Sequence, residues 1–427
     1  MKPVYRVLVF PGGTEIALEI GKSLRQNKLV ELLGAGMKVS SHAEFFFNRY
    51  FAVPSVREEG WVDALNAIIA EQSVDFVFPA HDDALLALSR NRSKIKARIV
   101  TSPEKTCEIT RSKSATYSLF ADVLRVPKVF AAPAEIPSYP VFVKPDAGQG
   151  SQRSQPVSNC EELQVLLAKH RDLIVMEALP GREFTVDCFS DRERGLLFAC
   201  GRERVRTRSG ISMNCRRVED ARFRQIADTI ANRLEFHGAW FFQLKEAADG
   251  QLALLEIAPR VAGTSAFCRV LGVNLPLLSI YEQERVAVEI QVNRLDVELD
   301  RALVNVYRHS LEFSTVYVDL DDTLIVRGGV NEELVRLLFQ FSNQRKKLVL
   351  LSRHAGDLPG LLRRHRLLGL FDEIVHLQNG EPKSSMITDP KSIFIDDSFS
   401  ERVEVGRARG IATFDQSMIE VLLNDRV

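Results

Sequence analysis

Residues 241–260 read FFQLKEAADGQLALLEIAPR, two apolar strand-like runs joined by Ala248-Asp249-Gly250. An Asp-Gly step between such runs is typical of a hairpin turn. Facing residues of a hairpin share one side of the sheet, so Gln243 and Glu256 are predicted to present their side chains to one face. Their oxygen atoms suit Mg²⁺, which takes few protein ligands and keeps several waters.

A glycine-rich turn lies about one hundred residues earlier. VFVKPDAGQGSQ (141–152) places Lys144 at a strand end, before Gly148 and Gly150. Glycines there would let backbone N–H groups approach phosphate oxygens. Alone the motif is weak evidence, since glycine is common in tight turns. It is followed by LIVMEALPGREFTVD (173–187), a strand and a short connection that place Glu177 and Glu183 to meet an adenine and a ribose.

Composition favours a soluble protein with small-molecule partners. The 427 residues are 45% hydrophobic and 26% charged, enough for two or three folding units. Lys plus Arg and Asp plus Glu both number 56, so no overall field favours nucleic acid or an anionic membrane. No apolar run is long enough to cross a bilayer, and we expect a cytoplasmic protein. The six cysteines lack a C-x-x-C pair, which indicates reduced buried thiols.

The order of elements predicts a mixed α/β and α+β architecture. The first third alternates strand-like runs with amphipathic stretches from about Glu15 and around Val62–Gln72, which is typical of βαβ units. Prolines between residues 127 and 140 mark an extended crossing into the next unit. We predict an α/β domain at 1–105, an α+β domain at 106–305 with lobes 106–190 and 191–305, and a small parallel-sheet domain at 314–427.

These motifs together resemble the ATP-grasp superfamily over about residues 1–300, in the branch of carbamoyl-phosphate synthase and related carboxylate-amine ligases. TRSKSATYSLF (110–120), LLEIAPRVAGT (254–264) and LGVNLP (271–276) add to the resemblance. It implies a Rossmann-like pre-ATP-grasp domain followed by a two-lobed ATP-grasp domain. It also implies ATP and Mg²⁺, with Mn²⁺ as an alternative ion.

The resemblance assigns roles by position. It places ATP phosphates against Lys113, Lys144, Gly148, Gly150 and Ser151. It places the adenine against Glu177, Ala178 and Leu179, and the ribose against Glu183. It gives Mg²⁺ to Gln243 and Glu256, and the transferred phosphoryl group to Arg260. Many relatives carry Asn two residues after the last metal-binding Glu, where this chain has Ala258, which weakens a third ligand.

Such a site would activate a carboxylate. ATP would phosphorylate the carboxylate oxygen, while Mg²⁺, the two lysines and Arg260 offset charge on the transferred group. An amine would then attack the acyl phosphate. The partners implied are therefore a small carboxylate and a small amine, and a homodimer is left open.

Three further features are ambiguous. GRERVRTRSGISMNCRR (201–217) falls where relatives carry a loop near the substrate, so Arg202, Arg206 and Arg208 either contact an anionic group or belong to a solvated basic loop. Asp82 and Asp83 either meet substrate at a strand end or cap a helix. Gly21-Lys22-Ser23 is not a P-loop, because Ile16 stands where that motif requires glycine.

TVYVDLDDTLIV (315–326) predicts a second, separate site. Residues two apart in a strand point to the same side, so Asp319 and Asp321 would emerge together at its carboxyl end. One carboxylate could attack phosphorus while the other protonates the leaving oxygen and later activates water. A turn or solvent patch would not explain the apolar strand in front of them.

This segment resembles the haloacid dehalogenase (HAD) superfamily over about residues 314–427. KLVLLSR (347–353), EPKSS (381–385) and SIFIDDS (392–398) are the further motifs. The resemblance implies Asp319 as nucleophile, Asp321 as general acid and base, Ser352 and Lys383 as phosphate-binding groups, and Mg²⁺ held by Asp319, Asp321, Asp396 and Asp397. Short spacings leave no room for a folded cap, so an open site and a bulky phosphorylated substrate, or a lid supplied by the ATP-grasp part, are expected.

The two resemblances lead to one working hypothesis. The first part would ligate a carboxylate to an amine, and the second would remove phosphate from a compound of the same pathway. An alternative is a nucleotide sensor, without ligase activity, that regulates the phosphatase. A scaffold of two inactive enzyme folds is disfavoured, because buried charged groups are costly to retain without a use.

Overall fold

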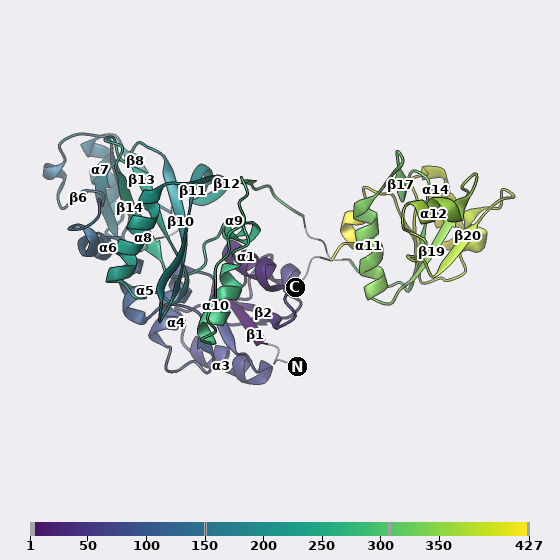
Figure 1. The fold of residues 1–427 in the computed structure, drawn as a ribbon, viewed down its shortest axis with the longest axis horizontal. Coiled ribbons are helices and arrows are strands. Elements are labelled where there is room, and N and C mark those ends of the chain that lie inside the picture. Colours follow the sequence, from purple (N-terminus) through teal and green to yellow (C-terminus); the bar gives the residue numbers. More distant parts are fainter. Residues whose placement is uncertain (1–4, 149, 151, 306, 308, 425–427) are drawn as a thin grey trace. The chain divides into compact units, whose positions relative to one another are not determined.

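The structure is a computed structural model that describes residues 5–148, 150, 152–305, 307 and 309–424. The chain divides into two compact units, residues 1–303 (unit 1) and residues 304–426 (unit 2). Unit 1 carries parallel and antiparallel sheets, and unit 2 carries a parallel sheet, so the mixed α/β prediction is confirmed (Figure 1). The finer division of unit 1 near residues 105 and 190 stays a prediction.

Unit 1 begins with a parallel five-stranded sheet in the order β3-β2-β1-β4-β5. Apolar side chains cover both faces of this sheet, as expected for parallel strands. Its strands are β1 (Tyr5–Phe10), β2 (Val30–Gly36), β3 (Tyr50–Ala52), β4 (Phe76–Pro79) and β5 (Arg98–Ile99). Its helices are α1 (Glu15–Leu24), α2 (Ala43–Phe46), α3 (Trp61–Gln72) and α4 (Asp82–Arg90). The helices predicted near Glu15 and from Val62 to Gln72 are confirmed.

A small antiparallel sheet follows, in the order β6-β9-β7-β8. Its core is a group of valines, leucines and Phe130. The strands are β6 (Val129–Phe130), β7 (Val141–Pro145), β8 (Gln155–Val157) and β9 (Leu173–Glu177). The helices of this region are α5 (Glu104–Arg111), α6 (Lys113–Phe120), a 3-10 turn η1 (Pro133–Glu135) and α7 (Cys160–Lys169).

The largest sheet of unit 1 has the order β14-β13-β10-β11-β12-β15 and is antiparallel. One of its faces packs on α8 (Ala221–Arg233) through buried aromatic residues that include Phe223 and Trp240. The strands are β10 (Glu183–Asp191), β11 (Gly195–Arg208), β12 (Ile211–Val218), β13 (Gly238–Glu246), β14 (Leu252–Ala258) and β15 (Glu298–Asp300). The helices α9 (Ala266–Val270) and α10 (Leu275–Gln283) complete the unit.

Unit 2 is a parallel five-stranded sheet in the order β20-β19-β16-β21-β22, with apolar clusters on both faces. Its strands are β16 (Thr315–Val318), β19 (Lys347–Ser352), β20 (Glu373–His376), β21 (Ser392–Ile395) and β22 (Ala412–Phe414), and β17 (Ile325–Val326) pairs with β18 (Gly329–Val330) as a small hairpin. Its helices are α11 (Glu332–Asn343), α12 (Leu358–Arg364), α13 (Lys383–Met386), α14 (Phe399–Arg409) and the 3-10 turn η2 (Ile419–Leu422).

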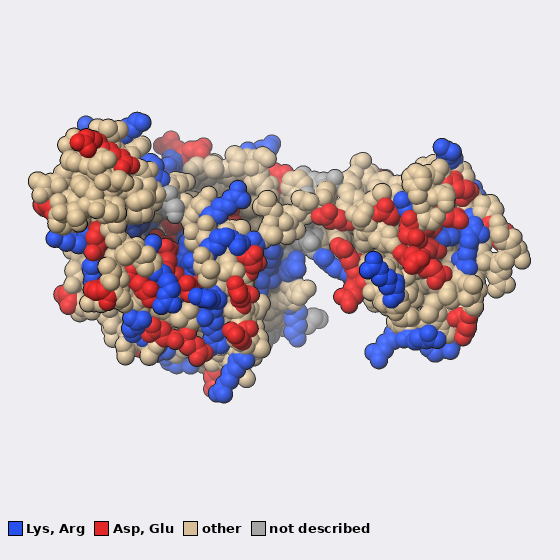
Figure 2. Space-filling model, turned by 90° about the horizontal axis from the view of Figure 1, so that it is seen from above, with Lys and Arg blue, Asp and Glu red and all other residues tan. Residues whose placement is uncertain are grey.

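The described part of the chain contains no helix that is both long and apolar enough to span a membrane. Acidic and basic side chains intermix over the face shown in Figure 2, in keeping with their equal numbers in the sequence.

The packing of α8 on the large sheet predicts a sensitive glycine. A Cβ atom on Gly201 of β11 would overlap the ring of Phe223, which also packs against Phe184. We expect Gly201→Ala to lower the free energy of unfolding by about 1–3 kcal/mol, because a close-packed core resists added volume. Urea unfolding followed by tryptophan fluorescence measures the change. Gly263→Ala is the control, since its Cβ would find ordinary contact with Ile16; equal stability of the two variants would contradict the prediction.

Candidate functional site

The β13–β14 hairpin places Gln243 directly opposite Glu256. Its turn closes through a hydrogen bond from the Gly250 N–H to the Ala247 carbonyl, and Gly250 has a φ of +78°, which glycine adopts without strain. On its other side Gln243 lies opposite Thr185 of β10. The structure therefore brings the two predicted metal ligands together on neighbouring strands.

Two lysines are buried beside this hairpin. Lys144, at the end of β7, donates from Nζ to the Leu255 carbonyl over 3.4 Å, and its ammonium lies 5.5 Å from the centre of the Tyr117 ring. Lys113, at the start of α6, donates from Nζ to the Gly148 carbonyl over 3.2 Å. Their backbone-carbonyl partners leave two buried positive charges that a polyanion would compensate.

The electrostatics of Lys144 reflect that burial. Desolvation, with repulsion from Lys113, lowers the pKa of Lys144 from 10.5 to about 8, although Glu256 and Glu183 oppose the shift. An opposite charge nearby would restore the charged form. The geometry and the lowered pKa together describe a site that favours an anionic ligand.

The glycine-rich turn joins β7 to β8. Gly150 has a φ of +60°, and a Cβ on Gly148 would press against Pro145, so both positions favour glycine. Arg111, at the end of α5, donates from Nη1 to the Gly148 carbonyl over 3.3 Å. Ser151, also predicted to bind phosphate, lies outside the described residues.

The residues predicted to meet adenine and ribose lie at the ends of β9 and β10. Glu177 accepts a hydrogen bond from the Lys128 N–H and pairs with Arg125 over 2.6 Å. Ala178 and Leu179 follow it, and Leu179 is buried in a small apolar cluster with Ala247, Ala253 and Leu255. Glu183 pairs with Arg204 over 2.8 Å. Both carboxylates are therefore partly engaged by arginines.

Arg260 follows β14 and is held by Asp82, at the start of α4. Its Nε and Nη2 donate to both carboxylate oxygens of Asp82 over 2.5 and 3.0 Å, and its guanidinium lies 5.1 Å from the centre of the Phe241 ring. Burial would raise the pKa of Asp82, but Arg260, together with Arg111 and His81, outweighs burial and lowers this pKa below 3.8. The neighbouring Asp83 binds Arg111 over 2.6 Å.

This arrangement excludes the helix-cap reading of Asp82 and Asp83, and their contact with substrate stays a prediction. Neither caps α4 with its side chain, because His81 does so by accepting a hydrogen bond at Nδ1 from the Asp83 N–H over 3.2 Å. Both aspartates instead orient arginines beside the site. A pocket gathers several of these groups with Ala258, and its lining residues are Asp82, Leu85, Cys107, Thr110, Arg111, Lys113, Gly148, Glu256, Ile257, Ala258 and Pro259.

The prediction of a loop at residues 201–217 is wrong, because this stretch forms the β11–β12 hairpin. Arg202 is 2% exposed and donates from Nε to Asp187 over 2.8 Å, so it is not a solvated loop residue, and its contact with an anionic group stays a prediction. Arg206 pairs with Asp300 over 2.5 Å at the surface, and Arg208 is exposed. β11 and β12 lie inside the sheet, between β10 and β15, and ion pairs with Asp187 and Asp300 on neighbouring strands accommodate basic side chains there.

Unit 2 gathers carboxylates at the ends of β16 and β21, which are adjacent and parallel. Asp319, Asp396 and Asp397 each offer an oxygen, and these three oxygens lie within 4.8 Å of one another. Lys383 bridges the group, because its Nζ is 2.6 Å from both Asp319 and Asp396. Thr323 donates to Asp397 over 3.0 Å. Oxygen donors grouped in this way fit a hard divalent cation.

The charges of this cluster are poorly compensated. Burial, with repulsion from Asp396, raises the pKa of Asp319 from 3.8 to about 6, although Lys383 opposes the shift. Burial also raises the pKa of Asp396. A cation bound among these oxygens would favour their ionised forms.

The other two predicted residues lie at or just beyond the ends of the paired strands β19 and β16. Ser352 ends β19, and its Oγ accepts a hydrogen bond from the His354 N–H over 3.0 Å. Asp321 is not brought into the carboxylate cluster, and it instead contacts His354, whose Nδ1 is 2.9 and 3.0 Å from its two oxygens. Sequence reasoning missed His354, although its position two residues after Ser352 was a usable signal.

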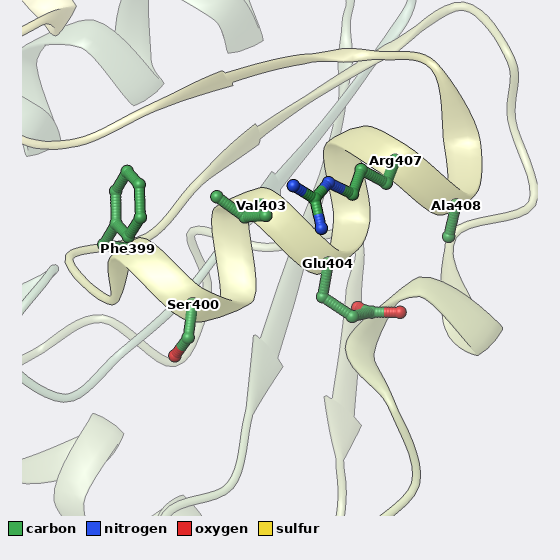
Figure 3. A pocket seen from close by; sticks show the side chains of 6 residues that line it. All are labelled: Phe399, Ser400, Val403, Glu404, Arg407 and Ala408. Atoms are coloured by element: carbon green, nitrogen blue, oxygen red, sulfur yellow. The ribbon is translucent and has the colours of Figure 1, made fainter.

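A separate hollow runs along one face of α14 (Figure 3). A single helix lines it, through Phe399, Ser400, Val403, Glu404, Arg407 and Ala408. None of the predicted site residues lines it, so it is not the place where the carboxylates converge.

Comparison with known proteins gives a family match for part of unit 1. A family model described as "ATP-grasp in the biosynthetic pathway with Ter operon" matches residues 169–301, which include Gln243, Glu256 and Arg260. No protein with a curated description matches the sequence.

Solved structures give the fold. The biotin carboxylase domain of 2-oxoglutarate carboxylase from Hydrogenobacter thermophilus, solved with MgADP, has a TM-score of 0.55 and 11% identity over 69% of this chain and 72% of that chain. An L-amino acid ligase from Bacillus licheniformis has a TM-score of 0.55 and 17% identity over 68% of this chain and 76% of that one. A pyruvate carboxylase from Rhizobium etli has a TM-score of 0.54 and 15% identity over 67% of this chain, which spans only 29% of that protein. With the family match, these likenesses support an ATP-grasp fold.

The Asp82–Arg260 pair leads to a stability prediction. We expect Asp82→Asn to lower the free energy of unfolding by about 2 kcal/mol or more, because it leaves a buried guanidinium without its counter-charge. Since Arg260 lowers the pKa of Asp82 below 3.8, the ion pair contributes to the free energy of unfolding at neutral pH. This stabilisation is lost as the pH falls below about 3.8 and Asp82 becomes protonated. Denaturant unfolding at pH 7 measures it.

The control is an exposed pair on α8. Arg224 and Asp228 lie 3.1 Å apart with about half of each side chain exposed. Asp228→Asn should change stability by less than about 0.5 kcal/mol, since solvent screens exposed pairs. Similar losses in both variants would show that the Asp82 contact is not specially stabilising.

Proposed function

We propose that unit 1 is an ATP-dependent ligase that joins a small carboxylate to an amine through an acyl phosphate. The observation that carries this proposal is the meeting of two buried lysines, Lys113 and Lys144, with the facing pair Gln243 and Glu256. The ammonium groups of both lysines donate to backbone carbonyls. Buried cations of this kind suit the phosphates of a nucleotide, and oxygen donors beside them suit Mg²⁺.

The side chains divide the work by their chemistry. Lys113 and Lys144 would bind phosphate oxygens, and the N–H groups of the turn at Gly148 and Gly150 would add neutral donors. Arg260 would offset charge on the transferred phosphoryl group, in an orientation fixed by Asp82. Mg²⁺ held by Gln243 and Glu256, or Mn²⁺ in its place, would neutralise nucleotide phosphates.

The proposed substrates of unit 1 are a class of compounds, small carboxylates and small amines. The structure of an L-amino acid ligase is among the neighbours, and the carboxylase domain among them was solved with MgADP, ADP and bicarbonate. These neighbours support small-molecule substrates and Mg²⁺ with the nucleotide. The same carboxylase domain was solved as a dimer, and a homodimer is part of the proposal on that ground.

For unit 2, we propose a Mg²⁺-dependent phosphohydrolase of the HAD type. Asp319 would attack phosphorus, Asp321 would protonate the leaving oxygen and activate water, and Ser352 and Lys383 would bind the phosphate. The contacts of Lys383 with Asp319 and Asp396 support this assignment, since one cation beside these two buried carboxylates and the exposed Asp397 leaves a deficit of positive charge. Mg²⁺ would supply that charge. A phosphorylated compound related to the ligase reaction is the proposed substrate.

The ligase proposal predicts ADP release that depends on both an amine and a carboxylate. Glu256→Ala should lower the rate by about 10²-fold or more, because it removes a metal ligand at the phosphoryl-transfer site. A coupled assay of ADP release over pools of amino acids and other small carboxylates makes the measurement.

Its control is Glu71→Ala, which changes an exposed residue of α3 and should leave the rate unchanged. Nucleotide binding without amine-dependent ADP release would reject ligation and support the alternative, a nucleotide sensor that regulates unit 2.

The phosphohydrolase proposal predicts a pH-dependent metal affinity. Because the pKa of Asp319 is raised to about 6, this carboxylate is protonated at lower pH and cannot bind Mg²⁺. Affinity for Mg²⁺ should therefore fall as the pH drops through 6, by up to about tenfold per pH unit. Titration calorimetry of the whole protein from pH 5 to pH 7.5 tests this.

Asp319→Asn should remove that pH dependence and lower phosphate release from p-nitrophenyl phosphate by about 10²-fold or more, as expected when a nucleophile is lost. Glu333→Gln, on the exposed first turn of α11, is the matched control. Full activity in Asp319→Asn would reject the phosphoaspartate mechanism.

A further inference from the structure

A short chain of hydrogen bonds joins the phosphate-binding hydroxyl to the acid-base carboxylate in unit 2. Its central residue is His354, which follows β19 on the loop towards α12. The His354 N–H donates to Ser352 Oγ over 3.0 Å, and the ring Nδ1 lies 2.9 and 3.0 Å from the two oxygens of Asp321. His354 therefore contacts both Ser352, which is proposed to bind the phosphate, and Asp321, which is the proposed general acid and base.

His354 is itself fixed in place. Its carbonyl accepts a hydrogen bond from His376 Nε2 over 2.7 Å, at the end of β20. Its side chain is 21% exposed, whereas that of Asp321 is 51% exposed. His354 is thus the less exposed partner of this contact, and its backbone is held by a hydrogen bond, whereas the Asp321 carboxylate is more exposed.

The contact with Ser352 has a consequence for phosphate binding. Because Ser352 Oγ accepts the backbone N–H, its hydroxyl hydrogen remains available for donation to a phosphate oxygen. Ser352 is fully buried at the end of β19, so the strand sets its position.

The contact with Asp321 has a consequence for proton transfer. Asp321 lies on an open turn, and the segment between β16 and β19 contains, in its described residues, one small hairpin and α11. No folded insertion covers the carboxylate there, so without a partner it would sample several rotamers. A hydrogen bond donated by His354 Nδ1 selects one rotamer of Asp321. It needs only the neutral imidazole tautomer that carries its hydrogen on Nδ1.

We propose that His354 is a positioning residue that holds the Asp321 carboxyl group for protonation of poor leaving groups, so that unit 2 acts on alkyl phosphomonoesters. This role rests on the proposed phosphohydrolase function. Asp319 forms the new bond to phosphorus as the ester P–O bond breaks, and the proton of Asp321 passes to the leaving alkoxide oxygen, which departs as an alcohol. Water, deprotonated by Asp321, then cleaves the phosphoaspartate to inorganic phosphate. His354 itself gains and loses no proton.

The role makes a specific kinetic signature. An alkoxide leaves only when protonated, whereas p-nitrophenolate leaves readily without a proton. Loss of a positioned acid therefore slows alkyl esters far more than activated aryl esters. A residue that only supported the fold would slow all esters alike.

The test compares His354→Leu with His354→Gln in the full-length protein with Mg²⁺. The substrates are p-nitrophenyl phosphate, phenyl phosphate and glycerol phosphate, with kcat and KM measured for each. We expect His354→Leu to lower kcat on glycerol phosphate by about 10- to 100-fold, which is part of the full effect of general acid catalysis because Asp321 itself remains. On p-nitrophenyl phosphate we expect kcat to fall by less than about threefold. His354→Gln, whose amide can donate to Asp321, should recover much of the loss, with KM little changed in both.

His365→Leu, at the end of α12, is the control for loss of a histidine, and thermal unfolding checks that every variant is folded. Equal losses on all three esters, or no rescue by His354→Gln, would overturn the positioning role while leaving the phosphohydrolase proposal intact. No phosphate release by the unaltered protein from any of the esters would overturn the proposed function, and the role of His354 with it.

Discussion

Buried like charges are the constraint on which both units depend. In unit 1, Lys113 and Lys144 are buried close enough that their repulsion contributes to lowering the pKa of Lys144. In unit 2, Asp319 and Asp396 share Lys383, and the pKa values of both aspartates are raised. Such charges are costly without compensation. In unit 1 the two ammonium groups repel each other, and Glu256 and Glu183 offset only part of the effect of burial on the pKa of Lys144. In unit 2 one ammonium group is shared by two carboxylates, which leaves an excess of negative charge suited to a cation.

Where local pattern decides geometry, the sequence was a good guide to the structure. The register of Gln243 with Glu256 depends on one hairpin, whose Asp-Gly turn was visible in the sequence. Asp319 and Asp396 come together because each follows an apolar strand, and parallel neighbours align their carboxyl ends. The helices α1 and α3 followed from amphipathic stretches. In each case a few consecutive residues contain the information.

The sequence was a poor guide where a contact joins distant segments. Arg260 and Asp82 are separated by 178 positions, and His354 and Asp321 by 33, so no local pattern links either pair. Arg202 shows the opposite error, since its many basic neighbours suggested a loop although the side chain is buried against Asp187. Charged residues are exposed in most cases, but an ion pair with a neighbouring strand can allow one of them to be buried.

The distant contacts make the N-terminal sheet part of the nucleotide-site candidate. Asp82 and Asp83 stand side by side at the start of α4, and each orients an arginine from another segment. Arg111 extends this link to the carbonyl of Gly148, in the turn that faces Lys113. Any shift of α4 would therefore move or unbalance charges at both ends of the pocket. Through Asp82 and Asp83, the start of α4 therefore fixes the orientation of both Arg260 and Arg111 beside this pocket.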